Sequence, residues 1–362
     1  MPRLFLGNFS FEQARQPGFN LTQQVLRREA ELACLWLAVA EPDDEILCPQ
    51  PIPAEFWSRM EALGCAAVRP LLPDQLSSSR ARLLVPWGWT PAVRMMAHRR
   101  QHSAAIPSQE AVWRVNSREF AFECCAAQDC LLPGEGLARS LPAARKLIQH
   151  VLIQSPGWVV KPNHGQAGRG QLRGTSPPTD KELATLQRLI ERQGVVHVEP
   201  LLSGKIELSG QWEIPEQGTP ELLGLMQLFT DARGTYQATG WKTLHLSLEV
   251  ESRMIERQRA VVSQIQSTGY FGPVGIDAMV AEGENEIQIR PVQDVNARWT
   301  MGRIGWEWGQ RFQQGKQHPE TSGIWSHSPV APRPESQLLS PEVIQSLPVL
   351  QRMWWTSPGR RN

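Results

Sequence analysis

The segment 158–170 constrains the fold of this chain most strongly, because an apolar run leads there directly into a glycine-rich loop. The sequence is W-V-V-K-P-N-H-G-Q-A-G-R-G, in which the apolar residues predict the end of a buried strand and Lys161-Pro162 ends it. Glycine adopts positive φ at little steric cost and leaves N–H groups free for phosphate oxygens, and the lysine adds a positive charge. The pattern fits either a polyphosphate-binding loop or an ordinary surface turn. The loop glycines are Gly165, Gly168 and Gly170.

Composition indicates an ordinary globular protein with enough apolar residues for two or three domains. The chain has 362 residues, of which 41% are hydrophobic and 20% charged, and its formal net charge is +1. This balance argues against a nucleic-acid partner, which a strongly basic chain would favour. The N-terminal apolar stretch is too short for a signal peptide, and no apolar segment approaches the roughly 20 residues of a spanning helix. We expect a cytoplasmic protein with no membrane partner.

Cysteine and histidine spacing does not favour a transition-metal site. The six cysteines include no C-x-x-C pair, and the group Cys124, Cys125 and Cys130 has no histidine nearby, so we expect reduced thiols. His98 and His102 have H-x-x-x-H spacing but enclose two arginines and no glutamate, which favours a basic solvated face.

Residues 1–110 predict strands that alternate with helices, which is typical of a parallel α/β layer. Thr90 is a candidate helix cap followed by Pro91 at the first helical position. Trp87 and Trp89, just before this helix, fit either a ligand-binding lip or simple apolar packing. The predicted strands are 3–6, 45–48, 66–68 and 82–85, and the clearest predicted helices are 53–63 and 91–98.

A second domain is expected over 111–315, with subdomains 111–194 and 195–315. In its first half Ser140 is a candidate helix cap and Gly194 a helix stop. A short strand, 195–198, then ends in Glu199-Pro200. The predicted helices of this half are 119–128, 140–154 and 181–193. The second half predicts an antiparallel sheet from strands 208–214, 221–229 and 236–246. We expect residues 316–362, rich in Pro, Ser and Gln, to form a tail that wraps the folded body or a second subunit.

A long helix over 251–268 precedes a predicted hairpin, with strands 274–280 and 286–295, that gathers metal-binding side chains. Alternation along an extended strand places Asp294, Asn296 and Arg298 on one face, and Asp277 can join them from the partner strand. Two carboxylates and an amide oxygen suit Mg²⁺, and an arginine beside them can bind phosphate charge. The alternative is a hairpin whose polar face is merely solvated.

These segments together resemble the ATP-grasp superfamily in its peptide-ligase and biotin-carboxylase-like form. V-V-K-P-N-H-G-Q-A-G-R-G resembles the lysine strand and glycine-rich lid, and V-H-V-E-P-L-L-S-G-K-I-E the adenine hinge. G-I-D and Q-D-V-N-A-R are similar to the metal-binding strands. The resemblance covers roughly residues 116–311 and implies α/β and α+β architecture: an ATP-grasp fold with an N-terminal Rossmann-like (pre-ATP-grasp) domain.

The resemblance also implies a role for each matched residue. ATP would be bound by Lys161 through its phosphates, by Glu199 and the backbone through Leu202 at the adenine, and by Glu207 at the ribose. Mg²⁺ (or Mn²⁺) would be held by Asp277, Asp294 and Asn296. Arg298 would face the γ-phosphate or the acyl phosphate, and Lys242 would be a phosphate-binding catalytic lysine.

Three positions depart from the family pattern. Arg118 stands where a first lysine is common, which keeps the charge but changes its geometry. Asp277 and Asp294 stand where glutamate is common, one methylene shorter. The alignment of Glu207 requires a one-residue slip in the preceding loop.

The implied function is an ADP-forming ligase that activates a carboxylate as an acyl phosphate and joins it to an amine. Its partners would be small-molecule carboxylate and amine substrates, and glutamate addition to a pterin- or furan-type cofactor is one family-style example. The alternatives are a non-catalytic ATP-binding or scaffold protein and a phosphotransferase on the same fold. A homo-oligomer is compatible with the sequence.

Overall fold

The computed structural model describes residues 1–15, 18–81, 83–100, 105–165, 170–202, 205–231, 234–282, 287–314 and 321–357. The chain divides into two compact units. The first contains Met1–Gln109, Gln237–Leu244 and Arg298–Asn362, and the second contains Glu110–Tyr236 and His245–Ala297. Residues 298–314 and the C-terminal segment therefore group with the N-terminal region, whereas we expected them in the ATP-binding domain and in a separate tail.

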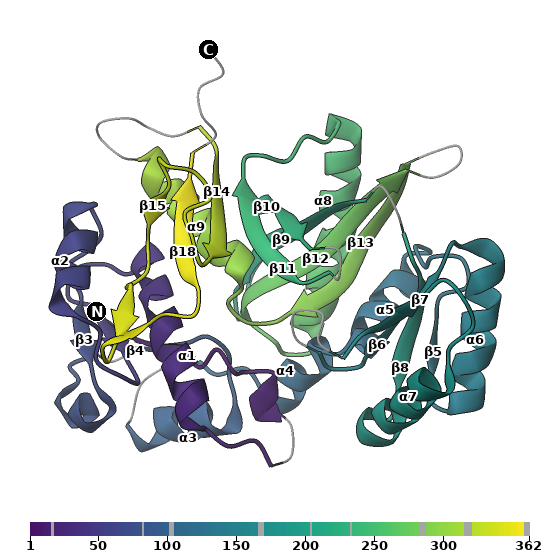
Figure 1. The fold of residues 1–362 in the computed structure, drawn as a ribbon, viewed down its shortest axis with the longest axis horizontal. Coiled ribbons are helices and arrows are strands. Elements are labelled where there is room, and N and C mark those ends of the chain that lie inside the picture. The colour runs from purple at the N-terminus through teal and green to yellow at the C-terminus, as the bar shows by residue number, and fades with distance from the viewer. Residues whose placement is uncertain are drawn as a thin grey trace. The chain divides into compact units, whose positions relative to one another are not determined.

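The first unit begins with a four-stranded parallel sheet of order β3-β2-β1-β4 (Figure 1). Leu4, Leu47, Leu71 and Leu84 from the four strands share one apolar cluster with residues of α3. The structure confirms the expected parallel α/β layer. Its strands are β1 (Arg3–Leu6), β2 (Glu45–Leu47), β3 (Arg69–Leu71) and β4 (Leu83–Pro86), and its helices are α1 (Gln23–Ala33), α2 (Ala54–Ala62) and α3 (Pro91–Arg99), with 3₁₀ turns at Gln13–Arg15, Cys34–Ala38 and Pro73–Ser78.

The predicted strand at 66–68 was wrong, because β3 lies three residues later. Pairing with β2 sets the position of β3: Arg69 lies opposite Glu45, and its Nη1 donates to Glu45 Oε1 at 2.9 Å. Pro70 within this strand lacks an N–H group, which an edge strand tolerates. The apolar residues at 66–68 carried no information about this tertiary pairing.

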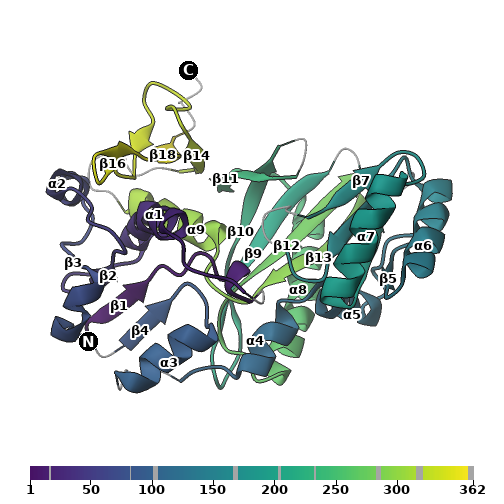
Figure 2. The same cartoon turned by 60° about the horizontal axis from the view of Figure 1, so that its bottom comes forward.

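The C-terminal segment of the first unit is folded, with strands that pair antiparallel in the order β11-β14-β18-β15. β14 and β18 lie side by side in both cartoon views (Figures 1 and 2). Trp325 and Trp355 are fully buried, and the Trp355 ring stacks on Phe312 at 4.8 Å. The elements are β11 (Tyr236–Trp241), α9 (Met301–Gln313), β14 (Gly323–Ser328), β15 (Gln337–Leu338), the hairpin of β16 (Val343–Ile344) and β17 (Leu347–Pro348), and β18 (Arg352–Thr356).

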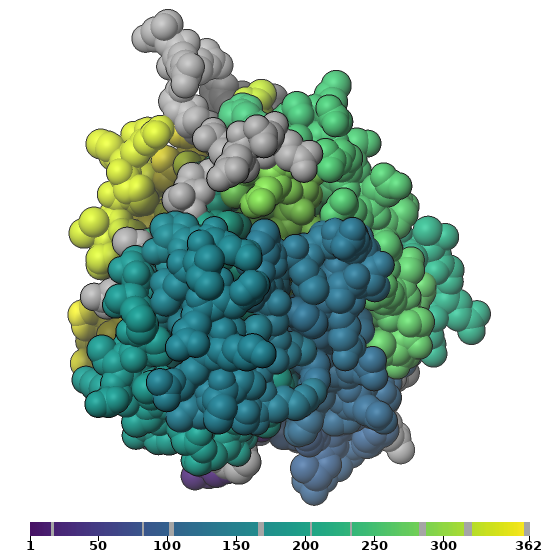
Figure 3. Space-filling view, turned by 90° about the vertical axis from the view of Figure 1, so that its right-hand side faces the viewer, coloured from purple at the N-terminus to yellow at the C-terminus, as the bar shows by residue number. Residues whose placement is uncertain are grey.

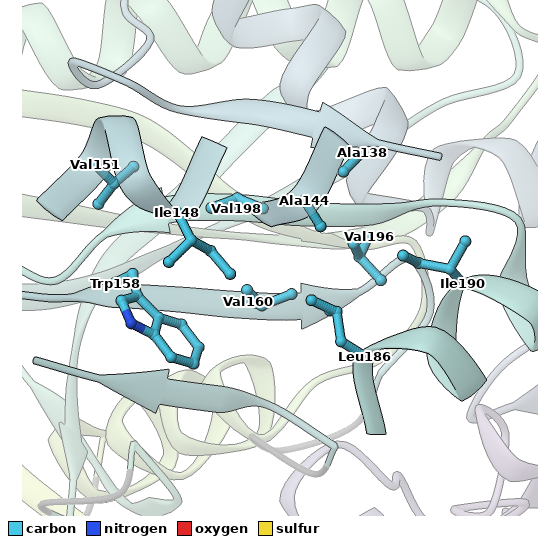
Figure 4. Packing of buried hydrophobic residues seen from close by; sticks show 10 residues of the cluster. All are labelled: Ala138, Ala144, Ile148, Val151, Trp158, Val160, Leu186, Ile190, Val196 and Val198. Atoms are coloured by element: carbon cyan, nitrogen blue, oxygen red, sulfur yellow. The ribbon is translucent and has the colours of Figure 1, made fainter. Parts of the chain in front are cut away.

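The second unit contains a small antiparallel sheet of order β5-β8-β6-β7. Helices α6 and α7 cover one face, where Trp158, Val160 and Val198 pack against Ile148 and Leu186 (Figure 4). In the space-filling view, the blue and teal residues of this part form a continuous surface (Figure 3). The elements are α4 (Gln109–Val115), α5 (Arg118–Ala127), β5 (Gly136–Ala138), α6 (Leu141–Gln154), β6 (Trp158–Pro162), β7 (Leu172–Gly174), α7 (Asp180–Gln193) and β8 (Val196–Pro200).

Local capping residues define the helix ends in this unit, because they satisfy the free backbone groups of a terminal turn or end the helix with a left-handed residue. Ser140 caps α6 by accepting from the Ala143 N–H, as the sequence predicted. Thr179 and Glu182 form a reciprocal capping box at the start of α7. Gly194 ends α7 in the left-handed conformation, with φ of 78°. Thr90 likewise caps α3 in the first unit.

A larger antiparallel sheet in the same unit has the order β13-β12-β9-β10, and α8 packs on it. Gln258 of α8 is fully buried there. Its Nε2 donates to the carbonyls of Ile276 and Pro291, and its Oε1 accepts from Trp212 Nε1 at 3.0 Å. The elements are β9 (Ile206–Ile214), β10 (Glu221–Thr230), α8 (Leu248–Ser267), β12 (Gly272–Glu282) and β13 (Ile287–Asn296).

None of the described helices is both long and apolar enough to cross a membrane. All six cysteines are buried free thiols, in agreement with the expected reduced state. Burial raises the pKa of Cys65 to about 11 and that of Cys48 to about 12, so these thiols resist ionisation.

We predict that Gln258→Leu destabilises the protein by about 2–4 kcal/mol, because it leaves two buried carbonyls and an indole N–H without a partner. Denaturant unfolding measures the change. Gln264→Leu, at a partly exposed position of the same helix, is the matched control and should change stability by less than about 1 kcal/mol. Equal losses in the two variants would contradict the role assigned to Gln258.

Candidate functional site

The small sheet of the second unit has one apolar face and one charged face. Because strand side chains alternate, Val160 and Val198 point to the helices (Figure 4), and Lys161, His197 and Glu199 lie on the opposite face. Lys161 lies directly across from His197 in the antiparallel pairing. These three polar residues are nonetheless buried, with exposed fractions of 6% or less. Buried charges require partners, so the contacts of this face define the site.

The Glu199 carboxylate is the centre of these contacts. Lys161 Nζ lies 2.5 Å from Glu199 Oε1, and Gln293 Nε2 donates to both carboxylate oxygens at 2.9 Å. Arg290 Nη2 donates to Oε2 at 3.4 Å. Burial would raise the pKa of Glu199, but the charges of Lys161 and Arg290 hold it well below its usual range. Burial also lowers the pKa of Lys161, whose charged form Glu199 stabilises. Glu199 is therefore an ionised carboxylate, and both of its oxygens accept hydrogen bonds from protein side chains.

A second buried carboxylate, Glu135, anchors Arg290. The two Nη atoms of Arg290 donate to the two oxygens of Glu135 at 2.5 and 2.6 Å, which is a bidentate pair. His197 Nε2 lies 2.6 Å from Glu135 Oε1. Burial would raise the pKa of Glu135, but its hydrogen bond with His197 and the charge of Arg290 lower it to about 2. We call these six residues the charge network: Glu135, Lys161, His197, Glu199, Arg290 and Gln293.

Part of the charge network has the composition of a metal site. Ligand atoms of Glu135, His197 and Glu199 lie within 4.8 Å of one another. Arg290 and Lys161 already balance the two carboxylate charges, however, and a divalent cation would be placed next to both of them. We therefore interpret this group as an ion-pair network.

The predicted metal ligands come together at the ends of β12 and β13. Asp277 lies directly opposite Asp294 in the antiparallel pairing, and Asn296 Nδ2 donates to Asp277 Oδ2 at 3.0 Å. Asp294 is partly exposed, and its Oδ2 accepts from Arg118 Nη2 at 2.8 Å. The donor set of two carboxylates and an amide oxygen fits a hard cation such as Mg²⁺. Arg118 engages one of the carboxylate oxygens, so the arrangement fits one cation better than two.

Arg118 connects these candidate metal ligands to the start of the glycine loop. Its Nη1 donates to the Pro162 carbonyl at 2.6 Å, at the end of the lysine strand. A Cβ atom at position 165 would lie 2.9 Å from that Nη1, so a larger residue here would displace the Arg118 guanidinium. Gly170 has φ of 77°, a conformation that favours glycine. Gly168 lies outside the described residues. The arginine at the first-lysine position thus contacts the Asp294 carboxylate in this structure.

The predicted hinge follows β8 directly. Leu202 is partly buried, and its N–H donates to no described residue, whereas the Leu201 N–H donates to the Gly157 carbonyl at 2.8 Å. Glu207 lies on β9, where it accepts from Thr230 Oγ1 at 2.9 Å and pairs with Lys205 Nζ at 2.5 Å. Its role at a ribose stays a prediction.

The expectation that Arg298 shares a strand face with Asp294 and Asn296 was wrong. β13 ends at Asn296, and Arg298 belongs to the first unit, where its Nε donates to Glu12 Oε1 at 2.5 Å. Lys242 also belongs to the first unit, and its Nζ donates to Gln313 Oε1 at 3.1 Å. Their catalytic roles remain predictions.

Sequence reasoning missed four members of the charge network, namely Glu135, His197, Arg290 and Gln293. A signal was present in two of them. His197 interrupts V-H-V in a buried strand, and Arg290 interrupts the apolar run I-Q-I-R-P-V. A charged or polar residue inside such a run must have a buried partner. The identity of that partner, 155 residues away for Arg290 and Glu135, follows from tertiary structure alone.

No protein-family model matches the sequence. No curated protein matches it either. Solved structures do match the fold. A biotin carboxylase from Campylobacter jejuni aligns with a TM-score of 0.57 at 11% identity, covering 98% of this chain and 87% of its own. A phosphoribosylamine–glycine ligase from Thermotoga maritima gives 0.58 at 14% identity, covering 99% and 90%. A putative ATP-grasp superfamily protein from Archaeoglobus fulgidus gives 0.53 at 12% identity, covering 99% of each chain.

The lowered pKa of Glu135 predicts an acid-sensitive fold. Because its folded pKa of about 2 lies below the ordinary 4.5, its contribution to stability is complete above pH 4.5 and is lost as the pH falls towards 2. We expect wild type to lose roughly 2 kcal/mol more than Glu135→Met/Arg290→Met between pH 6 and 2.5, measured by denaturant unfolding. Parallel pH profiles for the two proteins would contradict this assignment.

Proposed function

We propose that this chain, which has the ATP-grasp fold with an N-terminal Rossmann-like domain, is an ATP- and Mg²⁺-dependent ligase that joins a carboxylate to an amine. The observation that carries the proposal is the arrangement in the second unit. Arg118 donates to the Pro162 carbonyl, which follows the buried Lys161 at the start of the glycine loop. It also donates to Asp294, which lies opposite Asp277. The matched structures include a biotin carboxylase–beta-gamma-ATP complex and a phosphoribosylamine–glycine ligase, which supports ligase chemistry.

ATP would be bound by groups that follow β6 and β8. Lys161 would bind its phosphates and Glu207 its ribose. The Glu199 carboxylate already accepts from Lys161, Gln293 and Arg290, which occupy its lone pairs. We therefore assign adenine recognition to the backbone after it, where the Leu202 N–H donates to no described residue. Glu199 would act by positioning Lys161.

Asp277, Asp294 and Asn296 would hold the magnesium ion. When bound there, it would neutralise phosphate charge. Arg118, which already contacts Asp294, would fix the orientation of that carboxylate. Arg298 and Lys242 keep the roles that the family resemblance implies, at the γ-phosphate or acyl phosphate and as a phosphate-binding lysine.

The proposed reaction needs positioning and charge neutralisation more than covalent help from the protein. A substrate carboxylate oxygen would attack the γ-phosphorus, the bond to the bridging oxygen of ADP would break, and an acyl phosphate would form. The amine nitrogen would then attack the acyl carbon, phosphate would leave, and the nitrogen would lose a proton. The glycine loop would exclude water that would otherwise hydrolyse the acyl phosphate.

A non-catalytic ATP-binding protein is the second candidate, because Arg118 engages a carboxylate that the metal would need. A phosphotransferase is the third. Release of ADP and phosphate from Mg-ATP, with a panel of amino acids and carboxylate metabolites, separates the three. Phosphate release that requires both a carboxylate and an amine supports the ligase. ATP binding without turnover indicates the second candidate, and ADP with a stable phosphorylated product indicates the third.

We predict that Lys161→Ala and Asp294→Asn each lower kcat/KM for ATP by at least about 100-fold, because each removes a charge that binds phosphate or metal. Circular dichroism should show a folded protein in each case. Lys181→Ala, at an exposed position of α7, is the control and should retain wild-type turnover. Full activity in either site variant would remove that residue from the site.

A further inference from the structure

A bulge in β13 lies between Arg290 of the charge network and the predicted metal ligand Asp294. Asp277 pairs with Asp294 and Met279 pairs with Arg290, so three residues of β13, 291–293, lie opposite the single residue Ala278. Pro291 in this bulge has no N–H to give to the ladder, and its carbonyl accepts from Gln258 Nε2 at 3.1 Å. The hydrogen bond from the buried Gln258 side chain therefore stabilises the bulge.

The bulge brings two side chains of β13 to one carboxylate. Arg290 and Gln293 are three residues apart, so in a regular strand they would point to opposite faces. Here both donate to Glu199 on β8. Glu135 also accepts two hydrogen bonds from the Arg290 guanidinium. The charge network therefore connects the lysine-bearing sheet to the strand that carries Asp294.

We propose that Glu135 and Arg290 are positioning residues for nucleotide binding, acting through Glu199 on Lys161. This role rests on the proposed function. Lys161 is 8% exposed at its side chain, and its one carboxylate partner in the structure is Glu199, counting the described residues. Arg290 and Gln293 donate to the same Glu199 carboxylate and so fix its position. Lys161, paired with that carboxylate, is thereby held in place for a phosphate.

Stability alone does not account for a buried pair of this kind. Replacing a buried ion pair by apolar residues of similar volume is often neutral or stabilising, whereas removing one partner is strongly destabilising. A double replacement by methionine therefore separates the two roles. It can preserve the packing, but it leaves Glu199 without its arginine donor.

The test compares wild type with Glu135→Met/Arg290→Met, measuring calorimetric binding of a non-hydrolysable ATP analogue with Mg²⁺ alongside denaturant unfolding. We expect the double variant to fold and to bind the analogue at least 10-fold more weakly. Arg114→Met/Glu123→Met, which removes an exposed pair of the same unit, is the matched control and should bind like wild type. Wild-type affinity in a folded double variant would overturn the positioning role while leaving the proposed function intact.

A second variant covers the case in which the double variant fails to fold. Arg290→Lys keeps the charge but cannot make the bidentate pair with Glu135. We expect it to fold and to bind the analogue several-fold more weakly, and unchanged affinity would overturn the role. A wild-type protein that binds no nucleotide would contradict the proposed function, and the positioning role with it.

Discussion

The buried Glu199 carboxylate is the interaction on which the second unit depends. A carboxylate with an exposed fraction of 4% is costly unless every lone pair has a donor. The donors come from β6 and from β13, where Arg290 precedes the bulge and Gln293 lies within it, so satisfying one charge fixes two sheets to each other. The same contacts fix Lys161 on β6, just before the glycine loop, and hold the strand that carries Asp294. The contacts that stabilise the Glu199 charge therefore also position the residues of the candidate site.

Local chemistry allowed much of the fold to be predicted from the sequence. Helix caps such as Ser140 and Thr90, and the stop at Gly194, act through adjacent backbone groups, so their signal is contained in a few residues. Alternation of apolar residues located most strands for the same reason. β3 was misplaced because its position depends on the pairing of Arg69 with Glu45.

The candidate site was predicted in part. The facing aspartates follow from hairpin pairing, which is a short-range relation. The end of β13 before Arg298, the pairing of Arg118 with Asp294 and the bulge at 291–293 depend on contacts between distant segments. Their common signal is a polar or proline residue inside an apolar run. Such a residue indicates that a partner exists without identifying it.

The proposed ligase follows from combining these pieces with the fold. Its candidate phosphate, adenine and metal groups from 161 to 207 and from 277 to 296 belong to the second unit. The fold alone does not select the substrates, because sites are added to folds by individual side chains. The proposed chemistry concerns the order of bond formation: a carboxylate oxygen attacks phosphorus before the amine attacks carbon.

Oxygen-isotope transfer tests this chemistry most directly. The carboxylate substrate found by the release assay would be labelled with oxygen-18 and turned over with Mg-ATP and the amine, and the released phosphate analysed by mass spectrometry. The account predicts that each phosphate carries one oxygen from the substrate carboxylate. Product formed with unlabelled phosphate would contradict the acyl-phosphate mechanism.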